Sequence, residues 1–321
     1  MQNSWSQLFS HGCRSLLVGL VLVACQPGPA QEQTTTVPNP PPLVDSLLIE
    51  LPYQLTEPLN RYALPSNLNE ISGLTYFRPG QLGMVQDELG RIFVYDLTQR
   101  AVVRTIDFAL PGDFEGVEWD GQHFYALRSD GILFRVDSSR SDGPNLEMLK
   151  TFLNDDDDVE GLGYRADTKQ LLLACKEPAR HKGRNDRFRA IFVYDLLTQD
   201  LLAQPLTIDL AGIQQVWQAT ARSEKAQEEA DEFDVEKEKS FKPSAIAVHP
   251  LTGHYYVLAS AGKLLVVLDP AGQVLSTHYL SRKTFSQPEG ICFSPKGTLY
   301  ISNEARDETA TLLEFEYQPH E

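Results

Sequence analysis

The chain has 321 residues, of which 42% are hydrophobic and 22% are charged, as in an ordinary soluble globular protein. Its formal net charge of −16 argues against nucleic-acid binding, because phosphate backbones bind basic surfaces. The same charge favours cations or basic partners.

Residues 1–24 predict a lipoprotein signal peptide. Arg14 precedes the apolar run "SLLVGLVLVAC", which is too short to span a bilayer as a mature helix. The run ends in Leu22-Val23-Ala24-Cys25, which resembles the lipobox of bacterial lipoproteins, in which cleavage precedes a lipidated cysteine. We therefore expect a bacterial cell-envelope protein anchored through Cys25, on the inner or outer membrane and on a side that the motif leaves open. The alternative is an ordinary secretory signal with an incidental cysteine.

The rest of the chain divides into a tether and one all-β domain. Residues 25–46 are rich in Pro and Thr, which predicts an extended tether. Over residues 47–321, short apolar runs alternate with Gly, Pro, Asp and Asn, as in short strands joined by turns. Cys175 and Cys292 lie in two of these runs, and we expect two separate buried thiols in preference to a disulfide.

Five related segments indicate the architecture of this domain. They are "SGLTYF" from Ser72, "EGVEW" from Glu115, "EGLGY" from Glu160, "SAIAVHP" from Ser244 and "EGICF" from Glu289. They recur about every 45 residues, apart from one interval of roughly twice that length, and such a period filled with short strands predicts a five-bladed β-propeller. Residues 58–65 would supply the outer strand that the last blade lacks and would so close the ring.

The long interval contains a charged insertion at about residues 212–240. Its second half, residues 221–240, lacks apolar alternation and predicts a charged helix or a loop. A degenerate sixth blade hidden in the insertion is the alternative to five blades.

The repeats also predict an acidic channel mouth. The starts of the inner strands and the ends of the second strands meet on one face of a propeller, near the axis. Five glutamates are the candidate metal ligands there: Glu115, Glu160, Glu289, Glu70 and Glu304. Further candidates on the same face are Ser72, Asp87, Glu177, Ser244 and Asn303. The glycine that follows three of the glutamates would allow the inner strands to approach closely.

The type of ligand suggests the ion. Converging carboxylates repel one another unless a proton or a cation relieves the repulsion. Their oxygen atoms favour a hard cation, Ca²⁺ first and Mg²⁺ second. For any single glutamate, hydrogen bonds to strand amides and water would be the simpler explanation.

No catalytic residue is predicted. His123, His249 and His254 fall at turns on the face opposite the glutamates, and the G-x-S-x-G, H-E-x-x-H and P-loop spacings are absent from the sequence. We therefore expect a binding module in preference to an enzyme.

The repeats resemble the SdiA-regulated family, distant relatives of the NHL-repeat propellers. The resemblance spans roughly residues 50–317 and rests on five segments: "NEISGLTY", "DFEGVEW", "DVEGLGY", "KPSAIAVHP" and "QPEGICFSPKGTLYISNE". It implies a five-bladed propeller, association with the envelope or a membrane, and a bound calcium ion, but no established reaction. Ser244, where other repeats have Glu, departs from the pattern and leaves the ring incomplete on that side.

Together these features predict a lipid-anchored, calcium-binding, monomeric β-propeller that binds a protein or small-molecule ligand at its channel face. The alternative is a metal-dependent hydrolase, similar to the lactonases or esterases, because Asn303 beside Glu304 resembles the Glu and Asn set of propeller lactonases. A third hypothesis is an ion that only holds the blades together.

Overall fold

The computed structural model describes residues 48–137, 145–178, 187–221, 228, 233, 241–306 and 308–319. Contacts within the chain separate Met1–Asn39 from Pro40–Glu321, and all the described residues belong to the second unit. The predicted signal peptide, Cys25 and the tether lie outside the described residues, as does most of the charged segment 221–240.

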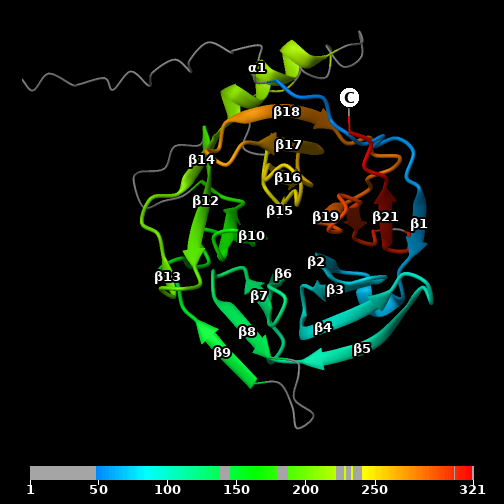
Figure 1. The fold of residues 1–321 in the computed structure, drawn as a ribbon, viewed down its shortest axis with the longest axis vertical. Helices are drawn as coiled ribbons and strands as arrows, with labels where there is room; N and C mark the ends of the chain where they lie inside the picture. Colours follow the sequence, from blue (N-terminus) through cyan, green and yellow to red (C-terminus); the bar gives the residue numbers. More distant parts are fainter. Residues whose placement is uncertain are drawn as a thin grey trace, which may run out of the picture. The chain divides into compact units, whose positions relative to one another are not determined.

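Five antiparallel sheets surround a common axis, and in all but the last blade the strands follow chain order from the axis outward (Figure 1). Blade one contains β2 (Ile71–Arg78), β3 (Gln81–Gln86), β4 (Leu89–Asp96) and β5 (Ala101–Asp107). Blade two contains β6 (Phe114–Trp119), β7 (Phe124–Arg128), β8 (Leu133–Asp137) and β9 (Asn145–Leu149). Blade four contains β15 (Ala245–Val248), β16 (Tyr255–Ala259), β17 (Leu264–Leu268) and β18 (Val274–Tyr279). The prediction of an all-β, five-bladed propeller is confirmed.

Blade three differs from the others in its outer edge. It contains β10 (Val159–Arg165), β11 (Gln170–Cys175), β12 (Phe188–Asp195), β13 (Asp200–Leu201) and β14 (Leu206–Asp209). Both β13 and β14 pair with β12, one at each end, so two short strands share the place of a single outer strand.

The last blade is closed by both ends of the described chain, as the sequence predicts. β19 (Pro288–Phe293), β20 (Leu299–Asn303) and β21 (Thr311–Phe315) are followed outward by β1 (Asn60–Ala63), after which a short 3₁₀ turn, η2 (Ser66–Leu68), leads to blade one. β1 pairs with β21 from Asn60 opposite Glu314 to Ala63 opposite Thr311. This pairing covers the edge of β21 that would otherwise be free to pair with another chain.

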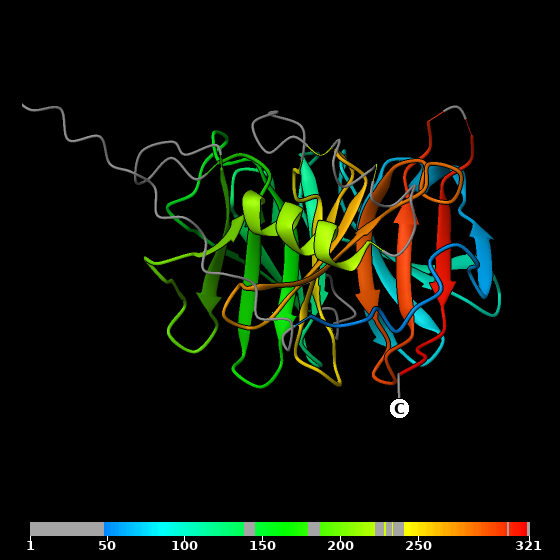
Figure 2. The ribbon, with the colours of Figure 1, turned by 90° about the horizontal axis from the view of Figure 1, so that it is seen from above.

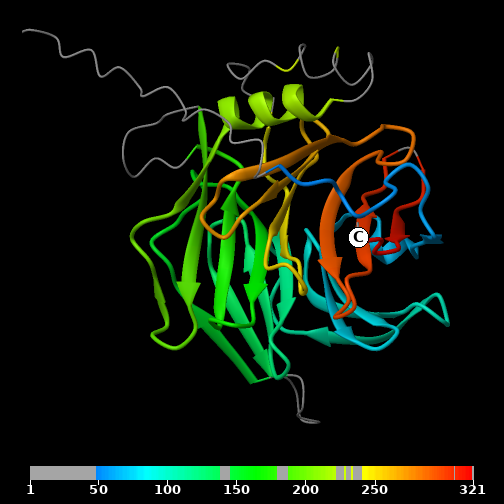
Figure 3. The ribbon, with the colours of Figure 1, turned by 45° about the horizontal axis from the view of Figure 1, so that its top comes forward.

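The first half of the insertion forms the one long helix of the described residues, α1 (Leu210–Thr220). Asp209 caps its N-terminus by accepting a hydrogen bond from the Ala211 amide. The apolar face of α1 packs against β18 on the outside of blade four (Figure 3). Trp217 on that face stacks on Tyr279 with ring centroids 6.4 Å apart. The sequence analysis did not predict this helix.

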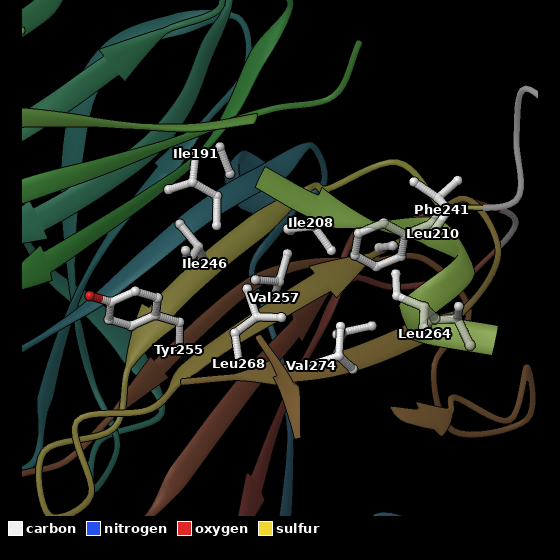
Figure 4. Packing of buried hydrophobic residues seen from close by; sticks show 14 of the residues in the cluster. Ile191, Ile208, Leu210, Phe241, Ile246, Tyr255, Val257, Leu264, Leu268 and Val274 are labelled. Carbon is white, nitrogen blue, oxygen red and sulfur yellow. The ribbon is translucent and has the colours of Figure 1, made fainter. Parts of the chain in front are cut away.

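The core lies between adjacent blades. Figure 4 shows one such layer, where Ile191 of blade three, Ile246 and Val257 of blade four and Leu210 of α1 gather in one cluster. Cys175 and Cys292 are separate buried thiols, as predicted. Within the described part of the chain, no helix has the length and apolar character needed to cross a membrane.

Candidate functional site

A β-bulge at the start of the inner strand positions the predicted ring residues. In the side view of Figure 2 the strands of the blades cross from one face to the other. The pairing of the first two strands skips one residue in four of the five blades, and the skipped residues are Ser72, Glu115, Glu160 and Glu289. A bulged residue is outside the regular alternation of the strand, so its side chain can turn toward the axis.

The glycine after each bulged residue is required by crowding. A Cβ atom on Gly116 would lie 2.6 Å from Leu162 Cβ in the next blade, and one on Gly73 would lie 2.8 Å from Gly116 Cα. Distances this short are closer than van der Waals contact, so only glycine fits without a shift of the neighbouring strand. The predicted close approach of the inner strands is thus present.

The two serine positions have a different local role. Ser72 donates a hydrogen bond of 2.6 Å to the carbonyl of Phe114, and Ser244 donates one of 3.2 Å to the carbonyl of Pro288. Each bond connects the inner strand of one blade to that of the next. At these positions the hydroxyl joins blades, whereas the glutamates extend their carboxylates into the channel mouth.

These residues surround a cavity of about 700 Å³ on one face of the propeller. Its lining includes all five predicted glutamates together with Ser72, Asp87 and Ser244. A second cavity of about 10 Å³, lined in part by Glu115, Glu160, Leu74 and Leu162, lies next to it. A space of that size holds at most about one water molecule. The larger cavity is called the cup below.

Two predicted candidates lie elsewhere. Glu177 is not part of the cavity lining and pairs with Lys242 at 2.5 Å. Asn303 is 1% exposed, and its amide donates hydrogen bonds of 3.2 Å to the Thr284 carbonyl and to the Thr311 hydroxyl. Asn303 therefore supports the end of β20 from within the blade.

The histidines lie where the sequence predicts. His249 and His254 flank the turn between β15 and β16, and His123 directly precedes β7, at the ends of the strands remote from the cavity. His249 contacts the Tyr53 hydroxyl at 2.9 Å within an aromatic cluster. His181 and His320 lie outside the described residues.

The ring also contains basic residues that the sequence analysis missed. Of the described residues, six carboxylates and five basic side chains line the cavity, so it has mixed charge. The basic residues are Lys176, Lys242, Lys263, Arg282 and Arg306. An alignment of second-strand ends would have identified Lys176, because it follows β11 directly, just as Asp87 follows β3 and Glu304 follows β20.

The blade-three wall of the cavity is neutralised by its own lysine. Lys176 forms an ion pair with Glu160 and lies 3.7 Å from Asp158. Burial alone would lower the pKa of Lys176, but the charge of Glu160 and the hydrogen bond to it outweigh burial and raise that pKa. Glu160 is therefore already paired with a cation.

Two pairs of carboxyl groups contact each other at the cavity, Glu115 with Asp113 and Glu304 of blade five with Glu70. Burial raises the pKa of Glu115 to about 10, and the charges of Glu160 and Asp113 and a hydrogen bond with Asp113 add to this rise. Burial likewise raises the pKa of Glu304 to about 8, with a hydrogen bond to Glu70 as the next cause. Two carboxyl groups in hydrogen-bond contact need a proton or a cation between them.

The oxygen atoms of these carboxyl groups are suitable ligands for a hard cation, but the described side chains are not arranged around one. As the described side chains lie, no three His, Cys, Asp or Glu groups converge closely enough to hold a metal ion. The donors are oxygen atoms of the kind that Ca²⁺ prefers. Occupancy would require side-chain rotations that bring Glu70, Glu304 or Glu115 together.

The sequence model of the SdiA-regulated family matches residues 204–306, which include α1, blade four and the two inner strands of blade five. Over these residues the match supports the resemblance to the SdiA-regulated family that the repeats indicate. No curated protein matches the chain in sequence.

Solved structures resemble this chain in fold. A glutaminyl cyclase of Myxococcus xanthus matches with a TM-score of 0.54 and 15% identity, over 83% of this chain and 97% of that one. The PQQ-bound aldose sugar dehydrogenase of Streptomyces coelicolor matches with a TM-score of 0.47 and 12% identity, over 81% of this chain and 97% of that one. The first similarity supports the propeller fold alone, and the second adds no argument.

Proposed function

We propose that this protein is a calcium-binding propeller module that receives a ligand in the cup of mixed charge at its channel face. The observation that supports this most directly is the pair of carboxyl contacts, Glu70 with Glu304 and Asp113 with Glu115. A divalent cation between such carboxylates would remove their repulsion without the uptake of two protons. Mg²⁺ is the second choice, because it demands a stricter octahedral geometry.

The proposal places the module at a membrane of the bacterial envelope. The support is the sequence Leu22-Val23-Ala24-Cys25, which would supply a lipid anchor, followed by a tether of about 20 residues. A protein monomer held in this way would present its cup to soluble small molecules or to protein partners in the envelope. The hydrolase alternative is weaker, because Asn303 is buried within its blade and does not line the cavity.

Calcium titration by calorimetry in a phosphate-free buffer tests the proposal. We expect stoichiometric binding to the purified protein, and a loss of affinity of roughly tenfold or more in Glu304→Gln, because Ca²⁺ affinity follows the number of charged ligands. Glu57→Gln removes an exposed carboxylate away from the cup and serves as the matched control. Absence of stoichiometric calcium at micromolar concentration would contradict the metal site.

Removal of calcium from the same purified protein distinguishes an ion that takes part in ligand binding from one that only stabilises the fold. If calcium only holds the blades together, its removal lowers the melting temperature and leaves ligand binding in the cup unchanged once the protein is folded. If calcium takes part in binding, chelation weakens ligand binding at temperatures where the fold is intact.

A further inference from the structure

Three basic residues form the wall of the cup that belongs to blades four and five. Lys263 immediately precedes β17, Arg282 follows β18, and Arg306 follows β20. They come from three separate loops, yet all three line the same cavity. Blade five also contributes Glu289 and Glu304 to the lining, so this basic wall lies within a cavity of mixed charge.

Lys263 is the buried member of this basic wall. The residue is 7% exposed, and its ammonium donates a hydrogen bond of 2.7 Å to the Ser286 carbonyl. Within the described residues it forms no ion pair, although the charge of Glu289 acts on it. Burial and the nearby charges of Arg306 and Arg282 lower the pKa of Lys263 to about 8. A buried cation beside two other cations is unfavourable unless an anion joins them.

The two arginines leave most of their donors available. Arg306 donates through Nε to the side-chain oxygen of Gln287, and Arg282 is exposed. Neither guanidinium forms an ion pair among the described residues. A guanidinium presents five donors in a fixed plane, and this geometry matches the oxygen atoms of a carboxylate or phosphate.

We propose that Lys263, Arg282 and Arg306 form an oxyanion subsite that binds the carboxylate or phosphate group of a small ligand in the cup. This inference deepens the proposed function and rests on it, because it assigns a ligand class to the same cavity. A cavity of about 700 Å³ matches the size of small-molecule sites, which range over about 300–1,000 Å³. The net charge of −16 disfavours polyanions such as nucleic acids, so a small anion is the ligand that can reach this local basic wall.

Titration with inorganic phosphate and with acetate, after divalent cations have been removed on a chelating resin, tests the subsite. We expect saturable binding of at least one of these anions to the intact protein by calorimetry. Arg282→Gln should weaken it by about tenfold, as expected for the loss of one charge-assisted contact. Lys283→Gln is the matched control, because Lys283 is the next residue, is also exposed and does not line the cup. Lys263→Met should also weaken anion binding, and this variant is used if its melting curve shows an intact fold.

The outcomes distinguish this inference from the calcium proposal. Anion binding by the metal-free protein that is weakened in Arg282→Gln and kept in Lys283→Gln supports the subsite, whatever the calcium titration shows. If Arg282→Gln and Lys283→Gln weaken anion binding equally, or if the unmodified protein binds no anion, the subsite is overturned even if calcium binds.

Discussion

At the scale of the residue, the site depends on one extra residue in four of the five inner strands. The bulges at Glu115, Glu160 and Glu289 release these side chains from strand alternation and direct them to the axis. The following glycines are needed because each bulge presses its strand against the next blade. Glu-Gly is therefore one unit, in which the first residue contributes the carboxylate and the second makes room.

A methyl group at Gly116 tests this crowding. Gly116→Ala should lower the free energy of unfolding by about 1–3 kcal/mol, the usual effect of overpacking, because the new Cβ would lie 2.6 Å from Leu162 Cβ. Gly212→Ala is the matched control: Gly212 lies within α1, and a Cβ there meets nothing closer than 3.8 Å. That variant should gain up to about 1 kcal/mol from helix propensity. Urea unfolding measures both, and equal effects would refute the crowding argument.

At the scale of the element, closure of the last blade holds the ring together. β1 covers β21, and two side chains of β1 strengthen the pairing: Asn60 and Tyr62 donate hydrogen bonds of 2.9 and 2.7 Å to the Glu314 carboxylate. β1 and β21 are distant in sequence, so this contact joins the two ends of the described chain.

Truncation tests the closure. A chain that begins at residue 65 lacks β1, and we expect it to lose cooperative thermal unfolding or to self-associate, because the edge of β21 becomes free to pair with another chain. A chain that begins at residue 47 keeps β1 and should remain monomeric with an unchanged melting curve. Size-exclusion chromatography and thermal melts measure both, and a monomeric, cooperative shorter chain would show that closure by β1 is dispensable.

At the scale of the whole molecule, the charge of the cup differs from that of the chain. The net charge is −16, yet five basic side chains line the cup beside six carboxylates. Such a cavity can bind a small ligand that carries an anionic group, while the net negative charge disfavours large polyanions. A lipid anchor at Cys25 would keep this cup close to a membrane surface.

The anchor can be tested in the bacterial envelope. Cys25→Ala removes the residue that would carry the lipid, so we expect the protein to move from the membrane pellet to the soluble fraction. Cys13→Ala changes a cysteine of the same signal segment and should leave the protein in the pellet. Immunoblots of fractionated cells measure the distribution, and a Cys25→Ala protein that stays in the pellet would contradict the anchor.

The sequence by itself determined the number of blades, the closing strand and the identity of the ring glutamates. It did so because each blade is built from local hairpins, so the repeat of Glu-Gly and of strand length is visible along the chain. Even α1 had a readable pattern, since Leu210, Ile213, Val216 and Trp217 follow helical spacing. That segment was missed because the charged residues after it dominated the interpretation of the insertion.

Only the tertiary structure decided the chemistry of the cup. Strand ends and loops from all five blades meet at one face, and their spacing in sequence does not reveal which of them touch. Lys176 joins Glu160, and Lys263, Arg282 and Arg306 share one wall, because separate blades converge at the axis. Asn303, by contrast, turns into its blade. The physical reason is that strand pairing is local in the chain, whereas the environment of a channel side chain is set by its neighbours across the axis.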